Sequence, residues 1–166
     1  MILDAISHRR ACRSFKAESV PPALIEELIK AAQFAPTSRN RRPVEFVVVT
    51  DQKMRQAIHD VLVPQDFVAQ APVLIVPIAN TQTANNPQAD LALASQNIFL
   101  QATHLKLGSV WKHVHDGEEQ EKLRATLGIP EHFLIMNVIP IGYPAEMPPP
   151  HTDAEFDAKK IHHEKF

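Results

Sequence analysis

Two groups of arginines carry the clearest chemistry in the sequence. Six of the eight arginines lie between residues 9 and 42, first as Arg9, Arg10 and Arg13 and then as Arg39, Arg41 and Arg42. Guanidinium groups form charge-assisted, often bidentate bonds to phosphates and carboxylates. If the first group were helical, Arg9 and Arg13 would share one face and could converge on one phosphate. We therefore expect a local anion site, with a solvated basic surface as the alternative.

Three polar side chains lie beside the second group of arginines. Thr37, Ser38 and Asn40 follow Pro36 in a short stretch between a predicted helix and a predicted strand. Their hydroxyl and amide groups, with the free backbone groups of a loop, could contact a polar ligand ring. An ordinary helix-to-strand loop is the alternative.

Overall charge argues against a nucleic-acid partner. The 166 residues have a formal net charge of -2, whereas nucleic-acid binding usually requires a basic balance over the domain. The four glycines form no Gly-x-Gly-x-x-Gly or phosphate-loop spacing, so side chains and helix ends must hold any phosphate.

Neither the histidines nor the cysteine predicts a catalytic side chain. His113 and His115 could share one side of a strand, and His162 and His163 could add ligands, but no HExxH or paired Cys/His spacing supports a metal site. Cys12 lies among cations that favour a thiolate, yet no base is adjacent in sequence. We expect no metal and a cysteine that packs behind the anion site.

Length and composition predict a single domain over residues 1–166. Hydrophobic residues make up 45% of the chain, which can bury one sizeable core. A single cysteine excludes an intrachain disulfide, and the sequence has neither a secretory signal pattern nor an apolar run of about 18 residues. We expect a cytoplasmic protein with no membrane partner.

The apolar patterns predict alternating helices and strands that position these residues. Helices are expected over residues 3–10, 21–35, 52–61, 89–107 and 118–127, and strands over 45–50, 73–78, 109–113 and 133–141. The helix over 89–107 is apolar nearly all round, which suggests that a second copy of the chain covers one face. Residues 144–166 are rich in proline and charge, and should wrap as an arm over the rest of the chain or over a partner.

These residues together resemble the FMN-dependent nitroreductase family. The resemblance rests on residues 8–15, 20–21, 35–49, 90–97, 107–111, 127–130, 141–146 and 161–166, in that order, and spans essentially the whole chain. It implies an α+β fold with a central, mainly antiparallel sheet flanked by helices. It also implies an intertwined homodimer with an exchanged C-terminal arm, which binds FMN.

The resemblance assigns cofactor-binding roles to nine residues. It implies Arg9 as a ligand of the FMN phosphate, Arg13 as a basic contact toward the flavin and Arg10 beside them. The other implied residues lie near the flavin, several from the second subunit: Pro36, Thr37, Ser38, Asn40, Arg42 and Trp111. His151, Lys159 and Lys160 are the basic candidates on the arm, and none can be chosen from the sequence.

The chain departs from the family pattern at four positions. They are Ala11 for serine, Arg42 for glutamine, Val44 for tryptophan and Lys106 for glycine. Arg42 carries a permanent charge and cannot accept a hydrogen bond. It could pair with an acidic neighbour, point to solvent or face an anionic substrate.

The function that the resemblance implies is an oxidoreductase. The expected enzyme uses NAD(P)H and FMN to reduce nitroaromatic, quinone or related small organic acceptors by a ping-pong mechanism, with no catalytic side chain of its own. Two alternatives stay open: an FMN-binding or regulatory protein without useful turnover, and a flavin-cleaving or dehalogenating branch of the same family.

Overall fold

A central antiparallel sheet organises the chain, for which the computed structural model describes residues 2–62 and 65–166. The six strands are β1 (Val44–Val49), β2 (Val73–Asn80), β3 (Gly108–Ser109), β4 (Lys112–His113), β5 (Phe133–Ile135) and β6 (Asn137–Gly142). The strand order is β1-β2-β6-β3, with β4 also paired to β6 and β5 also paired to β2. All these pairings are antiparallel.

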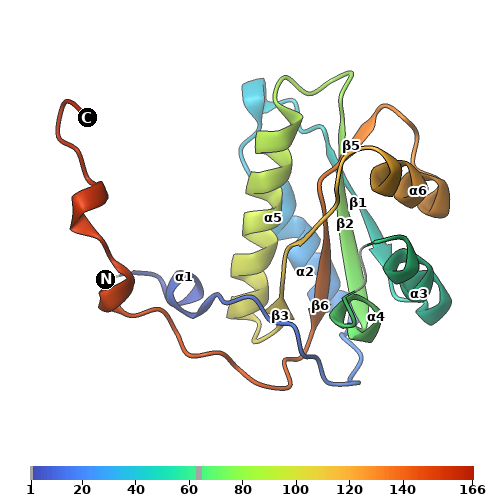
Figure 1. Cartoon of the computed structure of the whole chain (residues 1–166), viewed down its shortest axis with the longest axis horizontal. Coiled ribbons are helices and arrows are strands. Elements are labelled where there is room, and N and C mark those ends of the chain that lie inside the picture. The colour runs from blue at the N-terminus through green and yellow to red at the C-terminus, as the bar shows by residue number, and fades with distance from the viewer. Residues whose placement is uncertain (1, 63–64) are drawn as a thin grey trace.

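Helices cover both faces of this sheet (Figure 1). They are α1 (Asp4–His8), α2 (Pro22–Gln33), α3 (Gln52–Val61), α4 (Phe67–Gln70), α5 (Pro87–His104) and α6 (Glu118–Leu127), with 3₁₀ turns at Ser38–Asn40, Asp153–Glu155 and Ala158–Lys160. One buried cluster joins the sheet to α3, α4 and α6, and the other joins it to α2 and α5. The predicted α+β fold is confirmed.

Strand β2 is covered by helices on both faces, which explains its run of apolar residues. Leu74 and Val76 belong to the cluster beneath α3 and α6, whereas Val73 and Ile75 belong to the cluster beneath α2 and α5. Because successive side chains of a strand alternate between faces, a strand covered on both sides needs apolar residues at every position. The expected strand over residues 73–78 is confirmed and extends to Asn80.

The two later strands are each interrupted, which corrects the sequence prediction. Strands β3 and β4 keep one register against β6, and the gap between them lies opposite Pro140, which has no N–H to donate. Met136 separates β5 from β6, because the pairing to β2 shifts by one residue between them, as at a β-bulge.

Helix α5 is shifted towards the N-terminus relative to the prediction. Asn86 caps it by accepting a bond from the Ala89 N–H at 3.3 Å, with Pro87 in the first turn. Lys106 ends it with a φ of 61°, in the left-handed region that favours glycine. The predictions for α2 and α3 agree closely and α6 has the predicted bounds, whereas the first helix, predicted over residues 3–10, is only Asp4–His8.

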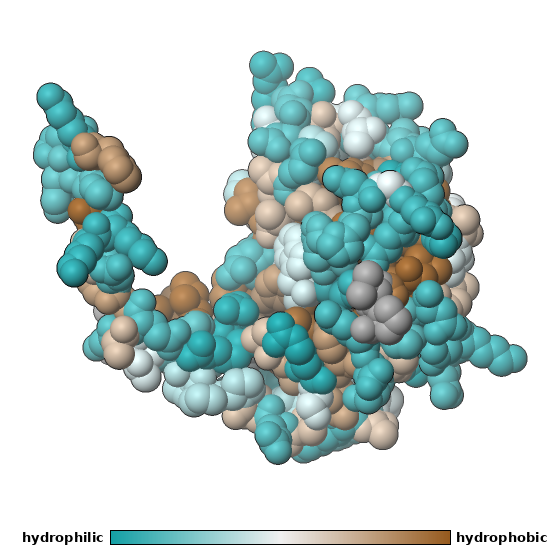
Figure 2. Space-filling model, viewed as in Figure 1, coloured by the Kyte–Doolittle hydropathy of each residue, from teal (hydrophilic) through white to brown (hydrophobic). Residues whose placement is uncertain are grey.

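The C-terminal arm, residues 144–166, extends away from the body of the protein (Figures 1 and 2). Phe156, Ile161 and Phe166 are exposed on it. Its contacts with the N-terminal segment include two backbone bonds, from Ala145 N to Ser14 O and from His151 N to Ser7 O. Within the described ranges, no helix is long and apolar enough to span a bilayer.

Candidate functional site

The first arginine group lies on an extended segment, which corrects the helical expectation. Helix α1 ends at His8, and Arg9 already has an extended backbone, with φ −64° and ψ 115°. Ala11 forms a parallel bridge with Ser109, and the Cys12 N–H donates to the Ser109 carbonyl at 2.9 Å. This segment therefore lies beside β3, because pairing with the sheet edge replaces the helical hydrogen bonds.

The buried Cys12 side chain packs the arginine segment against Gly108. It is 4% exposed, and a Cβ added at Gly108 would lie 2.6 Å from its Sγ, so the close approach requires glycine there. Burial raises the pKa of the Cys12 thiol, and the thiol donates to the Ser14 carbonyl at 3.3 Å. A protonated buried thiol is a packing group and not an activated nucleophile.

The three arginines of this segment have different surroundings. Arg10 donates to the Pro149 and Pro150 carbonyls and to both carboxylate oxygens of Glu155, so the arm occupies its guanidinium. The side chains of Arg9 and Arg13 have no hydrogen-bond or ion-pair partner among the described residues. Two cations at this edge are thus available to an anion.

The second arginine group lies on a strained loop between α2 and β1. Arg39, Asn40 and Arg42 have φ values of 54°, 53° and 49°, a conformation that costs free energy for residues other than glycine. The Thr37 Oγ1 accepts a bond from the Arg42 N–H at 3.0 Å. Asn85 donates to the Ser38 hydroxyl at 3.2 Å. Side-chain bonds therefore hold the backbone in this conformation.

Asp90 adds a further bond to this loop, and the sequence analysis assigned it no role. Its Oδ1 accepts from the Ser38 N–H at 3.2 Å, it is 2% exposed, and its Oδ2 has no partner among the described residues. An acidic residue in the first turn of a helix normally indicates only a favourable interaction with the helix dipole. The position of Asp90 in the sequence therefore gives no sign of its contact with Ser38, 52 residues away.

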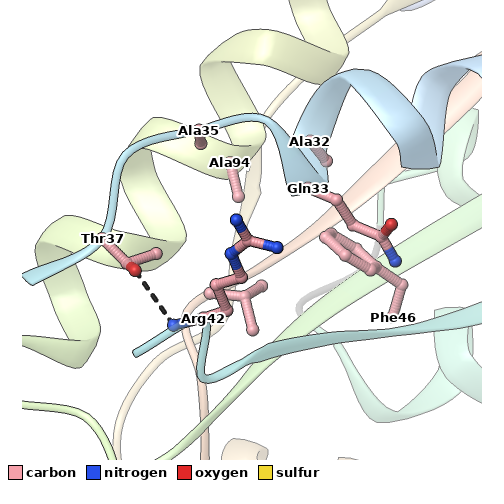
Figure 3. Close-up of a pocket in the computed structure, with 8 residues that line it drawn as sticks. Ala32, Gln33, Ala35, Thr37, Arg42, Phe46 and Ala94 are labelled. Atoms are coloured by element: carbon pink, nitrogen blue, oxygen red, sulfur yellow. Dashed lines mark hydrogen bonds between the residues drawn. The ribbon is translucent and has the colours of Figure 1, made fainter. Parts of the chain in front are cut away.

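A pocket of about 190 Å³ opens beneath this loop (Figure 3). It contains two of the predicted site residues, Thr37 and Arg42. The remaining lining residues come from α2, the loop that follows it, β1 and α5: Ala32, Gln33, Ala35, Val44, Phe46 and Ala94. These lining residues could not be grouped from the sequence, because they come from elements that are distant in the chain.

The two groups of predicted site residues lie at opposite ends of α5 (Figure 1). Arg10 and Cys12 face Thr103 and Leu107 at its C-terminal end, where Trp111 also packs against Phe99 with ring centroids 6.3 Å apart. Ser38 contacts Asp90 at the N-terminal end. A helix of 18 residues is about 27 Å long. One chain therefore does not bring the two groups together.

Comparison with known proteins places this architecture in a family. A sequence model of the nitroreductase family matches residues 6–64 and 58–143. A protein of Methanothermobacter thermautotrophicus, provisionally named an NADH dehydrogenase/NAD(P)H nitroreductase, is 38% identical, over 99% of this chain and 87% of its own length. The chain belongs to the nitroreductase family.

A solved structure supports the same assignment for this nitroreductase-family chain. The FMN-dependent nitroreductase of Clostridium difficile R20291 superposes with a TM-score of 0.94 at 29% identity, covering 99% of this chain and all of that one. An iodotyrosine deiodinase of Thermotoga neapolitana is 27% identical over 90% of this chain and 91% of its own length. The family relationship predicted from the sequence is confirmed.

The described residues also bear on the metal question. The rings of His113 and His115 meet edge to face with centroids 4.9 Å apart. Within the part of the chain that the structure describes, no group of three or more His, Cys, Asp or Glu side chains is arranged to hold a metal ion. The polar chemistry of the described site thus resides in arginine, hydroxyl and amide groups.

Proposed function

We propose that this nitroreductase-family chain is an FMN-dependent oxidoreductase that uses NAD(P)H to reduce nitroaromatic, quinone or related organic acceptors. The observation that carries the proposal is the pair of unpartnered cations, Arg9 and Arg13, on a segment that pairs with the sheet edge through Ala11 and Cys12. The family membership and the FMN-dependent relative of equal length support it.

The donor set of the chain fits the two ends of FMN. Arg9 would hold the phosphate and Arg13 would make a basic contact toward the flavin, because both guanidinium groups lack other partners and match acceptor oxygens of the cofactor. Arg10 adjoins them and connects this segment to the arm. Trp111 is half-buried beside this segment and would contact the flavin ring.

The remaining cofactor contacts would come from a second copy of the chain. Pro36, Thr37, Ser38 and Asn40 lie at the far end of α5 from the arginine segment. In a two-fold dimer with antiparallel α5 helices, the loop of one copy would lie beside the arginines of the other. We therefore propose a homodimer with shared flavin sites.

Apolar surface supports this dimer. A groove of about 520 Å³ separates α1 from α2 and α5, and Leu3, Phe34 and Leu100 line it. Leu93 on α5 is also exposed, as is Phe156 on the arm. Exposed apolar patches of this kind mark interaction surfaces, and the arm has too few contacts with its own chain to form a core. We propose that the arm wraps over the partner subunit.

Bound FMN would supply the redox chemistry, accepting hydride from NAD(P)H and passing electrons to the acceptor. We propose a ping-pong order, in which NAD(P)⁺ leaves before the acceptor binds the same face. The residues of the chain bind, orient and exclude water, and none has to act as a nucleophile. A dehalogenating activity is the second candidate, favoured by the similarity to the deiodinase.

The absorbance spectrum of the purified protein tests the proposal directly. We expect flavin bands, FMN as the released cofactor and steady oxidation of NADH or NADPH in the presence of a quinone or nitroaromatic acceptor. Protein that carries FMN but does not oxidise either nicotinamide would favour a flavin-binding or regulatory role. Iodide release from iodotyrosine would favour the dehalogenating activity.

Mixing two defective variants tests whether the site is shared. Arg9→Ala with Arg13→Ala removes the two arginine contacts to FMN, and Ser38→Trp places a bulky side chain on the loop. In a shared site, a mixed dimer has one site with both halves intact, so mixing should restore FMN binding to part of the protein. If each site came from a single chain, mixing would restore none.

A further inference from the structure

Arg42 has a backbone conformation that its own residue type does not favour. Its φ is 49°, and the next residue is Pro43, which also disfavours helical conformations at the preceding position. Strain of this kind persists where the surroundings over-determine it, and it occurs often at binding sites. Here the Thr37 hydroxyl holds the Arg42 N–H, and the Asn80 N–H donates to the Pro43 carbonyl at 3.0 Å.

A hydrogen bond also orients the side chain of Arg42. Its Nε donates to the Asn40 Oδ1 at 3.1 Å, which turns the end of the guanidinium towards the pocket (Figure 3). Neither of its terminal nitrogens has an acceptor among the described residues. The acidic neighbour that the sequence left open is thus not found in the described part of the chain.

The pocket combines this cation with apolar walls. Val44 and Phe46 of β1, Ala94 of α5, and Ala32 and Ala35 surround it, and no carboxylate is among its lining residues. Thr37 and Gln33 add a hydroxyl and an amide. Its volume is about 190 Å³, and an apolar cavity of about 150 Å³ is known to bind benzene. A single ring with one small substituent fits this space.

We propose that this pocket binds a small aromatic carboxylate, with the ring between Phe46 and Ala94 and the carboxylate on the Arg42 guanidinium. A bidentate guanidinium–carboxylate bond fixes orientation as well as affinity. Apolar walls favour the ring over a fully hydrated anion. The proposal that aromatic acids are the acceptors rests on the proposed reductase function. The proposal that the pocket binds an aromatic carboxylate does not depend on that function.

Inorganic phosphate is the main competing ligand chemistry for Arg42. Phosphate would use the same charge but gain nothing from Val44, Phe46 and the three alanines. A ring without charge, such as benzamide, would use the walls but not the guanidinium. Benzoate, benzamide and inorganic phosphate therefore separate the contributions of the ring and the charge.

Calorimetric titration of the FMN-loaded protein with these three probes tests the proposal. Benzoate should bind with a Kd of about 1 mM or tighter, and more tightly than either other probe. Arg42→Gln should weaken benzoate at least about tenfold, and Arg42→Lys should lie between, since it keeps the charge but loses the fork. Arg41→Gln is the matched control, because Arg41 donates to the Thr83 carbonyl and does not line the pocket.

Arg42→Gly separates binding from folding, because glycine adopts a positive φ without strain. It should keep the parent unfolding temperature and lose benzoate binding. Absent benzoate binding in the parent, equal affinity in parent and Arg42→Gln, or tighter binding of phosphate than of benzoate would each overturn the proposal.

Turnover then tests the acceptor class. The kcat/KM ratio of 4-nitrobenzoate to 4-nitrobenzamide should fall about tenfold in Arg42→Gln and stay unchanged in Arg41→Gln. An unchanged ratio in Arg42→Gln would overturn the acceptor assignment. If NAD(P)H is not oxidised with any acceptor while benzoate binds through Arg42, the reductase function fails and the pocket stands. If neutral nitroaromatics are reduced while benzoate does not bind, the function stands and the pocket fails.

Discussion

The two ends of α5 present cations in contrasting ways. At the C-terminal end, Arg9 and Arg13 project from a segment whose backbone is extended and paired with the sheet edge. At the N-terminal end, Arg42 lies on a loop with three non-glycine residues at positive φ. The arginine segment has an extended backbone, and its Arg9 and Arg13 side chains have no partner among the described residues. The loop has a strained backbone and a side chain directed by Asn40.

This difference indicates different kinds of ligand. Unpartnered arginines can adjust around a phosphate, for which charge matters more than one fixed direction. A guanidinium directed at a cost in backbone free energy suits a ligand with one allowed orientation, such as a ring carboxylate in the pocket beneath the loop. The same residue type thus serves cofactor affinity at one end and substrate choice at the other.

Among the described residues, the hydrogen bonds and ion pair that tie the arm to the rest of the chain go to residues 7–14, and removing the arm should give the largest effect. Truncation after Tyr143 deletes the partners of Arg10 and the exposed apolar residues that we assign to the dimer. We expect insoluble or FMN-free protein, measured by sedimentation and absorbance. A soluble, FMN-loaded monomer at micromolar concentration would contradict both the exchanged arm and the shared site.

Removing one phosphate ligand should give the next largest effect. Arg9→Ala deletes a charge-assisted bond worth about 1.5 to 3 kcal/mol, so the FMN affinity should fall about tenfold or more. Arg41→Ala, a change of equal size at the other end of α5, should leave it unchanged. Unchanged FMN affinity in Arg9→Ala would remove Arg9 from the site and, with it, the division of roles between the two ends.

A change beneath the arginine segment should disturb one end alone. Gly108→Ala places a Cβ 2.6 Å from the Cys12 Sγ and 2.8 Å from its Cβ, which should cost about 1 to 3 kcal/mol of folding free energy. Thermal unfolding measures this loss, and FMN retention should fall with it. Adding Cys12→Ala removes the nearest atom and should recover part of the stability.

The matching observation at the other end is the affinity for benzoate. It should be the same in Gly108→Ala and in the parent, since Arg42 and its pocket share no contact with Gly108. A parallel loss of benzoate and FMN binding would show that the two ends are coupled, either through α5 or across the shared site, and do not act separately.

Local patterns in the sequence predict much of this fold. The β2 run and the α6 helix with its closing Gly128 follow from rules that act over a few residues. The α3 cap is of the same kind, since the Asp51 side chain accepts from the Met54 N–H at 2.9 Å. The short helix α4 at Phe67–Gln70 has too few residues to show a period, and was missed.

The features that could not be predicted depend on contacts between distant residues. Helix α1 stops early because Ala11 pairs with Ser109, and no periodicity in residues 3–13 contains that information. Arg10 looks identical to Arg9 in sequence, yet it is tied to Glu155, 145 residues away. The pocket around Arg42 likewise exists only once α2, β1 and α5 are packed.

The smallest expected effect concerns the contact between the arm and the arginine segment. The hydrogen bond from His151 lowers the pKa of Glu155 most, and with Arg10 and the Thr152 N–H it brings that pKa from 4.5 to about 2. His151 lies 2.7 Å from the Glu155 carboxylate, and its other ring nitrogen lies 3.2 Å from the Arg9 carbonyl. The two ring nitrogens of His151 therefore connect the arm carboxylate to the backbone of the arginine segment.

Because the folded pKa of Glu155 is depressed, its contribution is present above pH 4.5 and is lost as the pH falls towards 2. The arm should therefore loosen from Arg10 over that range, seen as a change in the NMR shift of the His151 amide, which donates to Ser7. Glu155→Gln should show the loosened signal at neutral pH and no change in that range. Glu146→Gln, which removes another exposed carboxylate of the arm, should behave like the parent. A pH response that survives in Glu155→Gln would assign the response to another group and contradict the role of Glu155 in holding the arm to Arg10.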